Sequence, residues 1–390
     1  MIPHLRRRFN DAFSPDKYRR LLELVERGSG VPPAYPHCET PFFLPGDLTE
    51  RCVRYGREMV EQLLASAEYR RASDRAVPPQ WKAPNEADRP LFVQADFGLI
   101  RDASGGWEPR LVEIQGFPSL FAYQPLFARS YREAYDLDPR LESMPDHLSE
   151  DEYLRMLRRA IAGDCDPENV FLTEIDPDNQ KTRCDFALTE KLFGVRTADI
   201  AKLRKEGRRL YYNGVPVRRI YNRAIADELE RRRITLAFDF RDDLEVEWAG
   251  HPNWYFRLSK FSLPYLQHPG VPTTRFLDQV DDLGDPCRLV LKPLFSFAGA
   301  GVVIGPSREQ IDAIPPERRA DYIVQELVRF EPSVETPYGA TKIEIRVMYL
   351  WLDELRAVNT IIRAGRGAMM GVDHNKGLAW VGASAGFFEP

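Results

Sequence analysis

One stretch of the chain, LVLKPLFSFAGAGVVIG from Leu289 to Gly305, restricts the fold more than any other. An apolar strand delivers Lys292, a loop carries Gly299 and Gly301, and a second strand follows. Small residues let backbone N–H groups approach phosphate oxygens, and a lysine adds a compact positive charge. The stretch therefore predicts a β-loop-β unit suited to a polyphosphate, although a plain hairpin with glycines in its turn has the same pattern.

The common phosphate and metal motifs are missing. The sequence holds no GxxxxGK[ST], and no GxGxxG opens a helix in this stretch. The five cysteines are widely spread without a CxxC pair, and the six histidines form no HExxH. Neither a zinc site nor a disulfide framework is indicated. Any phosphate site here must differ from a Walker loop and from a Rossmann fingerprint.

Charge and hydropathy argue against several classes of partner. The 390 residues carry 54 basic and 59 acidic side chains, a net charge of −5, which disfavours a nucleic-acid binder. No apolar run approaches the roughly 20 residues of a membrane-spanning helix. The arginines at 6–8 are not followed by the apolar region of a secretory signal. We expect a cytoplasmic protein that binds neither nucleic acid nor membrane.

The pattern of secondary structure changes along the chain. The N-terminal part reads as helical, with Ser14 capping one helix and a second helix expected over 47–70. Two strands flank the turn at 104–106, which indicates a hairpin. A strand at 169–175 and a helix at 185–193 then begin an α/β pattern, and short β-rich runs with glycine turns follow. The sequence predicts an α/β (α+β) fold.

Charged residues follow one another in a definite order towards the C-terminus. Lys260 lies about 30 residues before Lys292, and Gln325-Glu326 closes an apolar strand about 30 residues after it. Glu344 and Arg346 alternate in KIEIRVMYLW, so a period-2 strand places both on one face. Arg363 comes next, followed by Asp373, Asn375 and Lys376 in VDHNKG.

This order of elements resembles the ATP-grasp superfamily. The resemblance is nearest to the permuted branch of eukaryotic-type glutathione synthetase and glutathionylspermidine synthetase. In that branch the strand with the Glu-x-Asn metal ligands precedes the rest of the ATP site. RLVEIQGFPSLFAYQ, residues 110–124, matches this element with Glu113 and Gln115 at the ligand positions. No Glu-x-Asn strand follows VGASAG near the C-terminus, which supports the permuted order.

The resemblance implies an ATP-grasp fold, in which antiparallel sheets cradle ATP. The resemblance covers about residue 90 to the C-terminus and implies three regions: a hairpin and helices contributing the metal-binding strand at 91–165, an α/β substrate-binding subdomain at 166–250, and the ATP-grasp nucleotide-binding region at 251–390. The helical N-terminal region at 1–90 is predicted from its sequence pattern and matches no part of the family. The implied nucleotide-binding residues are Lys260, Lys292, Gly299, Gly301, Gln325, Glu326, Leu327 and Glu344. Arg363, Asn375 and Lys292 are the implied catalytic residues.

The implied cofactors are ATP and Mg²⁺, and the metal ligands are Glu113, Gln115 and Glu344. Oxygen ligands suit Mg²⁺, which bridges substrate phosphates. Gln115 replaces the asparagine of the family, and Ser296 stands where the branch has a metal-binding glutamate. Asp373 and Asn375 form a rival metal pair by spacing alone.

The substrate residues depart further from the family. The resemblance implies substrate contacts from Gln94, Asp96, Ser119, Arg223 and Lys376. Gln94 stands where an arginine is expected, and small hydroxyl residues of the family are replaced by Pro118 and Leu120. These differences argue against a glutathione synthetase as such.

The predicted activity is an ATP- and Mg²⁺-dependent carboxylate–amine ligase that works through an acyl phosphate. Its substrates would be a small-molecule or peptide carboxylate and an amine, and a homodimer is left open. A small-molecule kinase on the same scaffold and a nucleotide-binding protein with weakened catalysis are the alternatives. In a ligase of this kind catalysis rests on positioning and charge neutralisation and needs no protein nucleophile.

Overall fold

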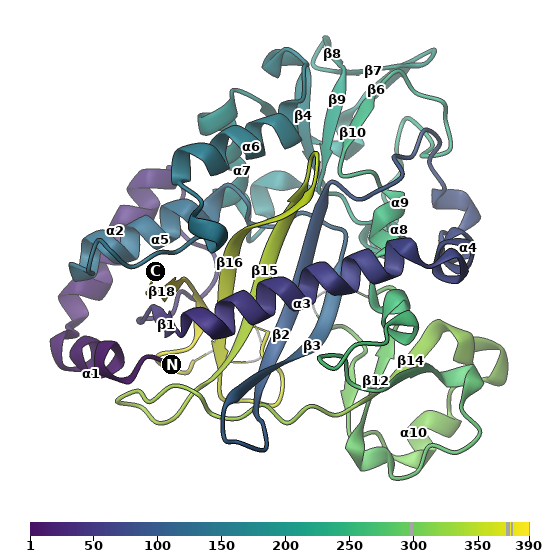
Figure 1. Ribbon diagram of the computed structural model, residues 1–390. Helices are drawn as coiled ribbons and strands as arrows, with labels where there is room; N and C mark the ends of the chain where they lie inside the picture. Colours follow the sequence, from purple (N-terminus) through teal and green to yellow (C-terminus); the bar gives the residue numbers. More distant parts are fainter. Residues whose placement is uncertain (297–298, 372–374, 376, 390) are drawn as a thin grey trace.

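A five-stranded antiparallel sheet of order β17-β16-β15-β2-β3 forms the centre of the computed structural model (Figure 1). The structure describes residues 1–296, 299–371, 375 and 377–389. The strands of this central sheet are β2 (Phe92–Arg101), β3 (Trp107–Gln115), β15 (Lys342–Trp351), β16 (Leu355–Gly365) and β17 (Gly382–Ser384). The β2–β3 hairpin was expected from the sequence and is confirmed, and the β-rich runs expected in the C-terminal part include β15 and β16, which pair antiparallel.

The β2–β3 hairpin joins a distant part of the chain. Its turn forms because the Asp102 carboxylate accepts hydrogen bonds from the backbone N–H groups of Ser104 and Gly106, each at 2.8 Å. Strand β2 then pairs with β15, placing Asp96 opposite Arg346. Chain segments about 250 positions apart thereby share one sheet, because the edge of each hairpin supplies the backbone partners of the other.

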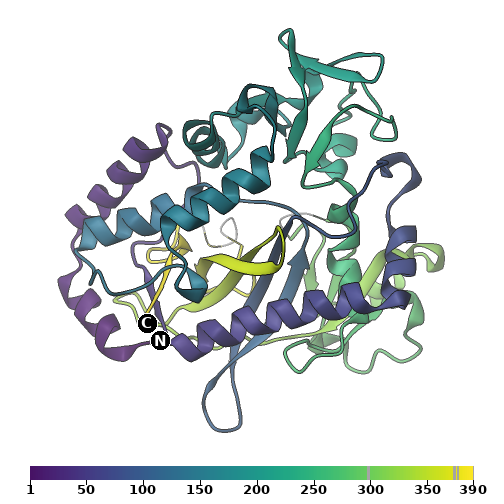
Figure 2. The same cartoon turned by 45° about the horizontal axis from the view of Figure 1, so that its top comes forward.

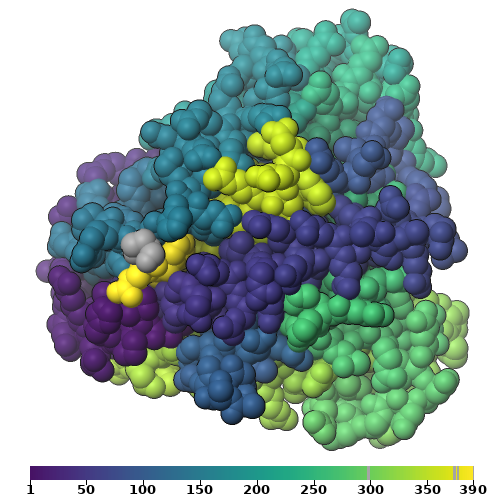
Figure 3. Space-filling model, in the orientation of Figure 1, coloured from purple at the N-terminus to yellow at the C-terminus, as the bar shows by residue number. Residues whose placement is uncertain are grey.

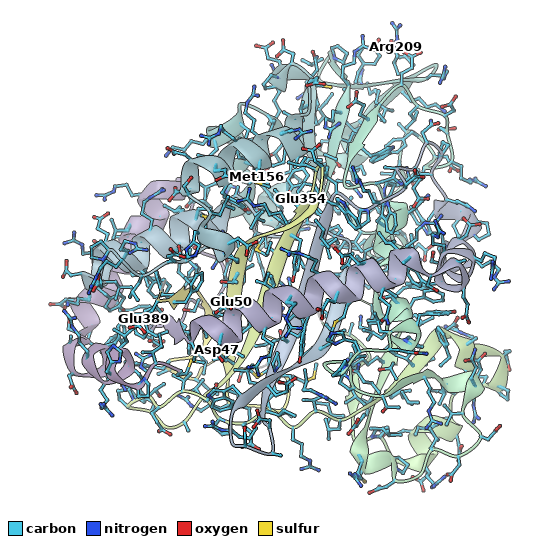
Figure 4. The ribbon with its side chains drawn as sticks, viewed as in Figure 1. Asp47, Glu50, Met156, Arg209, Glu354 and Glu389 are labelled. Atoms are coloured by element: carbon cyan, nitrogen blue, oxygen red, sulfur yellow. The ribbon has the colours of Figure 1, made fainter. Side chains whose placement is uncertain are left out.

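One face of the central sheet is apolar and covered by a long helix. Helix α3 (Gly46–Ala65) crosses this face in Figure 1, and its outer side lies at the surface in Figure 3. Ile345 and Val347 of β15 are fully buried in the same core as Leu48 and Cys52 of α3. Asp47 and Glu50 at the start of α3 are labelled in Figure 4.

The helix expected over 47–70 is instead two helices. Helix α3 ends at Ala65, and α4 (Ala67–Ala76) begins at once. The Ser66 hydroxyl accepts a hydrogen bond from the Tyr69 backbone N–H at 3.2 Å and so caps α4. The apolar periodicity continues across the break, which is why the pattern alone suggested one helix.

A second antiparallel sheet, of order β11-β14-β12-β13, lies at the lower right of Figure 1. Its strands are β11 (Thr274–Phe276), β12 (Leu289–Pro293), β13 (Val303–Ile304) and β14 (Tyr322–Glu326), and α10 (Arg308–Asp312) lies between β13 and β14 in sequence. The predicted β-loop-β unit is therefore confirmed as β12 and β13, which pair antiparallel.

A parallel sheet of order β10-β9-β4-β5 lies at the top of Figure 1, with a small antiparallel sheet β6-β7-β8 beside it. The elements of this region are β4 (Val170–Glu174), α7 (Arg183–Phe193), β5 (Arg196–Asp199), β6 (Arg204–Glu206), β7 (Arg209–Tyr212), β8 (Val215–Val217), β9 (Arg219–Asn222), α8 (Ala226–Arg231) and β10 (Glu247–Ala249). Arg209, labelled in Figure 4, marks its outer end. The strand expected over 216–221 is divided because Arg218 donates its N–H to Asn169 outside both strands, at 2.9 Å.

Further helices lie at the left and upper left of the molecule in Figures 1 and 2. They are α1 (Pro3–Ala12), α2 (Pro15–Ser29), α5 (Tyr123–Tyr135) and α6 (Glu150–Ala162), while the short α9 (Asn253–Arg257) precedes Lys260. Strands β1 (Phe42–Leu44) and β18 (Gly386–Phe388) pair in parallel and bring the two ends of the chain together (Figures 1 and 2). No helix among the described residues has the length and apolar character needed to cross a membrane.

Candidate active site

A cavity of about 390 Å³ lies between the polar face of the central sheet and the second sheet. Most of the residues predicted to form a site line it. These are Asp96, Glu113, Gln115, Ser119, Lys260, Lys292, Gly299, Gln325, Glu326, Leu327, Glu344 and Arg363. A volume of this size is within the range of small-molecule and cofactor sites.

Strand register gathers the charged side chains on one face. Asp96 of β2 pairs with Glu113 of β3 on one side and with Arg346 of β15 on the other. Glu344, two residues before Arg346, pairs with Arg363 of β16. Directly paired residues point to the same face, as do residues two apart in one strand. The five side chains therefore share one face, as the sequence predicted for Glu344 and Arg346.

These side chains form a buried ion-pair network. Arg346 binds Asp96 through both arms of its guanidinium, with Nε–Oδ1 and Nη2–Oδ2 distances of 2.6 Å. Its Nη2 also lies 3.7 Å from Glu113 Oε1. Arg363 Nη2 contacts both Asp96 Oδ2 and Glu344 Oε1. A bidentate arginine–carboxylate pair fixes orientation as well as charge.

Burial and these pairs shift the pKa values in opposite directions. Burial alone would raise the pKa of Asp96, but Arg346 and Arg363 outweigh it and hold that pKa below its ordinary value. Burial raises the pKa of Glu344, which Arg363 offsets only in part. The lowered pKa favours the charged form of Asp96, which binds both guanidinium groups.

Lys292 is buried opposite this network, with 6% of its surface exposed. Its Nζ donates to Gln325 Oε1 at 2.6 Å and to the Val112 carbonyl at 3.0 Å. Val112 is the extra residue of a β-bulge, because Asp96 pairs with Glu113 and the next residue pairs with Leu111. Burial lowers the pKa of Lys292 from 10.5 to about 8.

Lys260 approaches the cavity from the segment that follows α9. Its Nζ donates to the Ser296 carbonyl at 2.7 Å, which ties it to the start of the glycine loop. The loop itself requires glycine: Gly299 and Gly301 have φ of +77° and +71°. A Cβ on Gly301 would also lie 2.8 Å from Pro293 Cγ. Gly299 lines the cavity, whereas Gly301 shapes the turn behind it.

The residues predicted to meet adenine lie at the end of β14. Gln325 is buried and holds Lys292, whereas Glu326 is exposed at the cavity edge. The backbone N–H groups of Glu326 and Leu327 donate to Thr273 and Arg288, each at 2.8 Å. A base at this edge would therefore meet side chains and carbonyl groups rather than these two N–H groups.

Gln94 and Arg223 do not line the cavity. Gln94 is buried behind Ser119, to whose carbonyl it donates at 2.9 Å, and it accepts from Arg346 at 3.0 Å. Arg223 lies at the end of β9, with its guanidinium carbon 5.0 Å from the centre of the Phe117 ring. It approaches Thr182 Oγ1 at 3.5 Å. Direct substrate contact by Gln94 or Arg223 stays a prediction.

Asn375 is buried, and both the oxygen and the nitrogen of its side-chain amide form hydrogen bonds with nearby backbone groups. Its Oδ1 accepts from the backbone N–H groups of Arg366 and Gly367 at 3.0 and 3.2 Å. Its Nδ2 donates to the carbonyls of Met369 and Gly371 at 3.0 and 3.2 Å. The side chain thus organises the loop that borders the cavity, and its predicted contact with a phosphate or acyl group stays a prediction. The predicted residues Asp373 and Lys376 lie outside the described residues.

Other lining residues were not predicted as site residues. They include Tyr35, Lys181, Tyr255, Arg346, Met369 and Met370. Arg346 carried a usable signal, since it shares a strand face with Glu344 and the rest of the strand, from Val347 to Trp351, is apolar. The others come from loops and helices, and their approach to the cavity depends on packing that no local pattern encodes.

The predicted Mg²⁺ ligands do not form a preformed metal site. Glu344 is paired with Arg363, and the Gln115 amide lies 2.8 Å from Gln94 Oε1. Glu113 retains a 27% exposed side chain facing the cavity. Among residues 1–296, 299–371, 375 and 377–389, no group of three or more histidine, cysteine, aspartate or glutamate side chains is arranged to hold a metal ion. The donor set present does not fit the predicted site.

No protein-family model matches the chain, and no curated protein matches its sequence. Among solved structures, it is similar to a glutathione synthetase-like effector from Globodera pallida, solved in its apo form. The TM-score is 0.60, and the match covers 97% of this chain and 98% of that one. At 13% identity, the likeness shows the fold alone. It supports the predicted fold at the level of a glutathione synthetase-like protein.

Proposed function

We propose that the cavity binds ATP and that the protein is an ATP-dependent carboxylate–amine ligase. The observation that carries this proposal is the pair of buried lysines, Lys260 and Lys292, facing Arg363 across one cavity. Three fixed cations around an enclosed space suit a triphosphate and the charge that develops during its transfer. The likeness in fold to a glutathione synthetase-like protein supports the same assignment.

The proposed reaction has two steps. A substrate carboxylate oxygen attacks the γ-phosphorus of ATP, the bond to the β-phosphate oxygen breaks, and ADP leaves. The amine then attacks the acyl carbon, loses a proton, and displaces inorganic phosphate to give the amide. Lys292 and Lys260 would hold the phosphates, and Arg363 would stabilise the acyl phosphate. The protein contributes position and charge and forms no covalent bond.

ATP binding is the first test. Calorimetric titration with ATP should give saturable binding in the wild type and at least a tenfold loss in Lys292→Met, as expected when a charged hydrogen-bond donor is removed. Lys82→Met is the matched control, because Lys82 pairs with Asp74 at the surface, at 2.9 Å. Equal ATP affinity in wild type and Lys292→Met would contradict the phosphate site.

Product analysis separates ligase from kinase. Incubation with ATP and a panel of carboxylates and amines should yield ADP, phosphate and an amide in equal amounts. A stable phosphorylated product would favour the kinase instead. The ion pairs that occupy Glu344 favour one further candidate, a nucleotide-binding protein with weakened catalysis, which would bind ATP and yield no ADP with any pair of substrates.

A further inference from the structure

Arg363 occupies an unusual position on the polar face of the central sheet. Its Nη2 contacts a carboxylate oxygen of Asp96 from β2 and one of Glu344 from β15. These two oxygens belong to different strands and converge on one nitrogen. A cation that bridges two carboxylates in this way has the place that a metal ion has in a carboxylate metal site.

The cations that line the cavity outnumber its carboxylates without any added ion. Four carboxylates line it, from Asp96, Glu113, Glu326 and Glu344, and five cations, from Lys181, Lys260, Lys292, Arg346 and Arg363. A divalent cation entering this wall would meet the positive charge of Arg363 at the point where Asp96 and Glu344 converge. Repulsion between charges separated by a few ångströms is strong in a partly buried site.

We propose that Arg363 is a built-in substitute for a divalent cation, so that this wall of the cavity, as far as the structure describes it, has no divalent-cation site of its own in the absence of nucleotide. The inference deepens the proposed function, because it says how the phosphate end of that site is neutralised. A guanidinium fixed by two carboxylates replaces an exchangeable ion with a permanent charge. Among the carboxylates of the central sheet that line the cavity, Glu113 is the one that Arg363 does not contact, and it is then at hand for an ion carried in by the nucleotide.

The test is binding of Mn²⁺ alone, followed by electron paramagnetic resonance of the free ion, with no nucleotide present. The cavity wall of the wild type should bind no Mn²⁺, so the wild type and Glu344→Gln should give the same Mn²⁺ titration. Arg363→Met removes the bridging charge and leaves the Glu344 and Asp96 carboxylates without their common partner, and it should gain one Mn²⁺ site at least about tenfold tighter than any Mn²⁺ binding by the wild type. Adding Glu344→Gln to this variant should abolish the new site.

Two further variants make the outcome decisive. Arg356→Met is the matched control, because Arg356 lies on the same strand but does not line the cavity. Its Nη1 donates a hydrogen bond to Glu152 Oε1 at 2.6 Å. It should gain no Mn²⁺. Arg363→Gln retains a hydrogen-bond donor and serves if Arg363→Met does not fold, as judged by circular dichroism.

Specific Mn²⁺ binding by the wild type that Glu344→Gln removes would overturn the inference. Failure of both folded Arg363 variants to gain a site would overturn it as well. Because no nucleotide is used, these results are independent of whether ATP binds. The ATP titration tests the proposed function, and the Mn²⁺ titration tests this inference, so a failure of one can be told from a failure of the other.

Discussion

Replacing Lys292 by methionine tests the physical state of the buried lysine. At pH 7 the variant loses a buried charge, and the lowering of the Lys292 pKa from 10.5 to about 8 corresponds to a cost of about 3 kcal/mol for that charge. It also leaves Gln325 Oε1 and the Val112 carbonyl without their donor, at about 1–3 kcal/mol each. The two contributions nearly cancel. We expect the free energy of unfolding of Lys292→Met to lie within about 2 kcal/mol of the wild type at pH 7.

The pH dependence has a definite sign. The unfolded chain holds the Lys292 proton up to about pH 10.5, whereas the folded chain releases it near pH 8. Between these values the unfolded state binds more protons, so the free energy of unfolding rises with pH. The destabilisation by the buried charge is fully present below pH 8 and disappears as the lysine loses its proton. Between pH 8 and pH 10, the wild type should gain about 2 kcal/mol relative to Lys292→Met.

Urea unfolding of both proteins, followed by tryptophan fluorescence at several pH values from 7 to 10, measures this difference. Taking the difference between two proteins removes the contributions of tyrosines and of other lysines that titrate in the same range. Lys82→Met, at an exposed position, should run parallel to the wild type throughout. If the free energies of unfolding of Lys292→Met and the wild type change with pH in parallel, Lys292 is not a desolvated cation. If Lys292→Met is less stable than the wild type by more than about 4 kcal/mol at pH 7, the two opposing contributions do not cancel.

Three further substitutions test the surroundings of the cavity. Arg346→Met leaves the buried Asp96 carboxylate with Arg363 as its remaining partner. It should lower the free energy of unfolding, measured in urea, by about 3 kcal/mol, and adding Asp96→Asn should restore part of this loss. Gly301→Ala should cost about 1–2 kcal/mol in the same measurement because φ is +71°, and a neutral result would contradict the loop geometry. Asn375→Ala removes four hydrogen bonds to the loop that follows Gly365, so limited proteolysis should cut this loop faster, with the rest of the chain unaffected.

Local patterns predicted the elements that have a regular period or a clear turn. The 104–106 turn follows Asp102 and carries glycines, and the β12–β13 unit carries glycines in its loop; both form as expected. Helix α5 was not predicted, because ten of its thirteen residues are buried and its polar side is narrow. Only Arg129, Arg132 and Glu133 mark that side, which leaves a weak amphipathic period. The break at Ser66 was missed because the apolar period continues across it.

The site was predictable where one strand carries its residues and less so where strands meet. Glu344 and Arg346 share a face by simple alternation, and the structure agrees. That Arg363 would bridge Asp96 and Glu344 depends on the pairing of three strands far apart in the sequence. Pairing register is set by turns and by the buried face together, and neither can be obtained from a motif.

The bulge at Val112 shows why register matters for the chemistry. In an unbroken strand, Leu111 and Glu113 would point to the same face. The extra residue places Leu111 opposite Phe97, in the apolar core under α3, and Glu113 opposite Asp96, in the cavity wall. It also leaves the Val112 carbonyl outside the strand pairing, where Lys292 donates to it. A single inserted residue thus turns a carboxylate into the cavity and supplies the acceptor that holds the lysine above it.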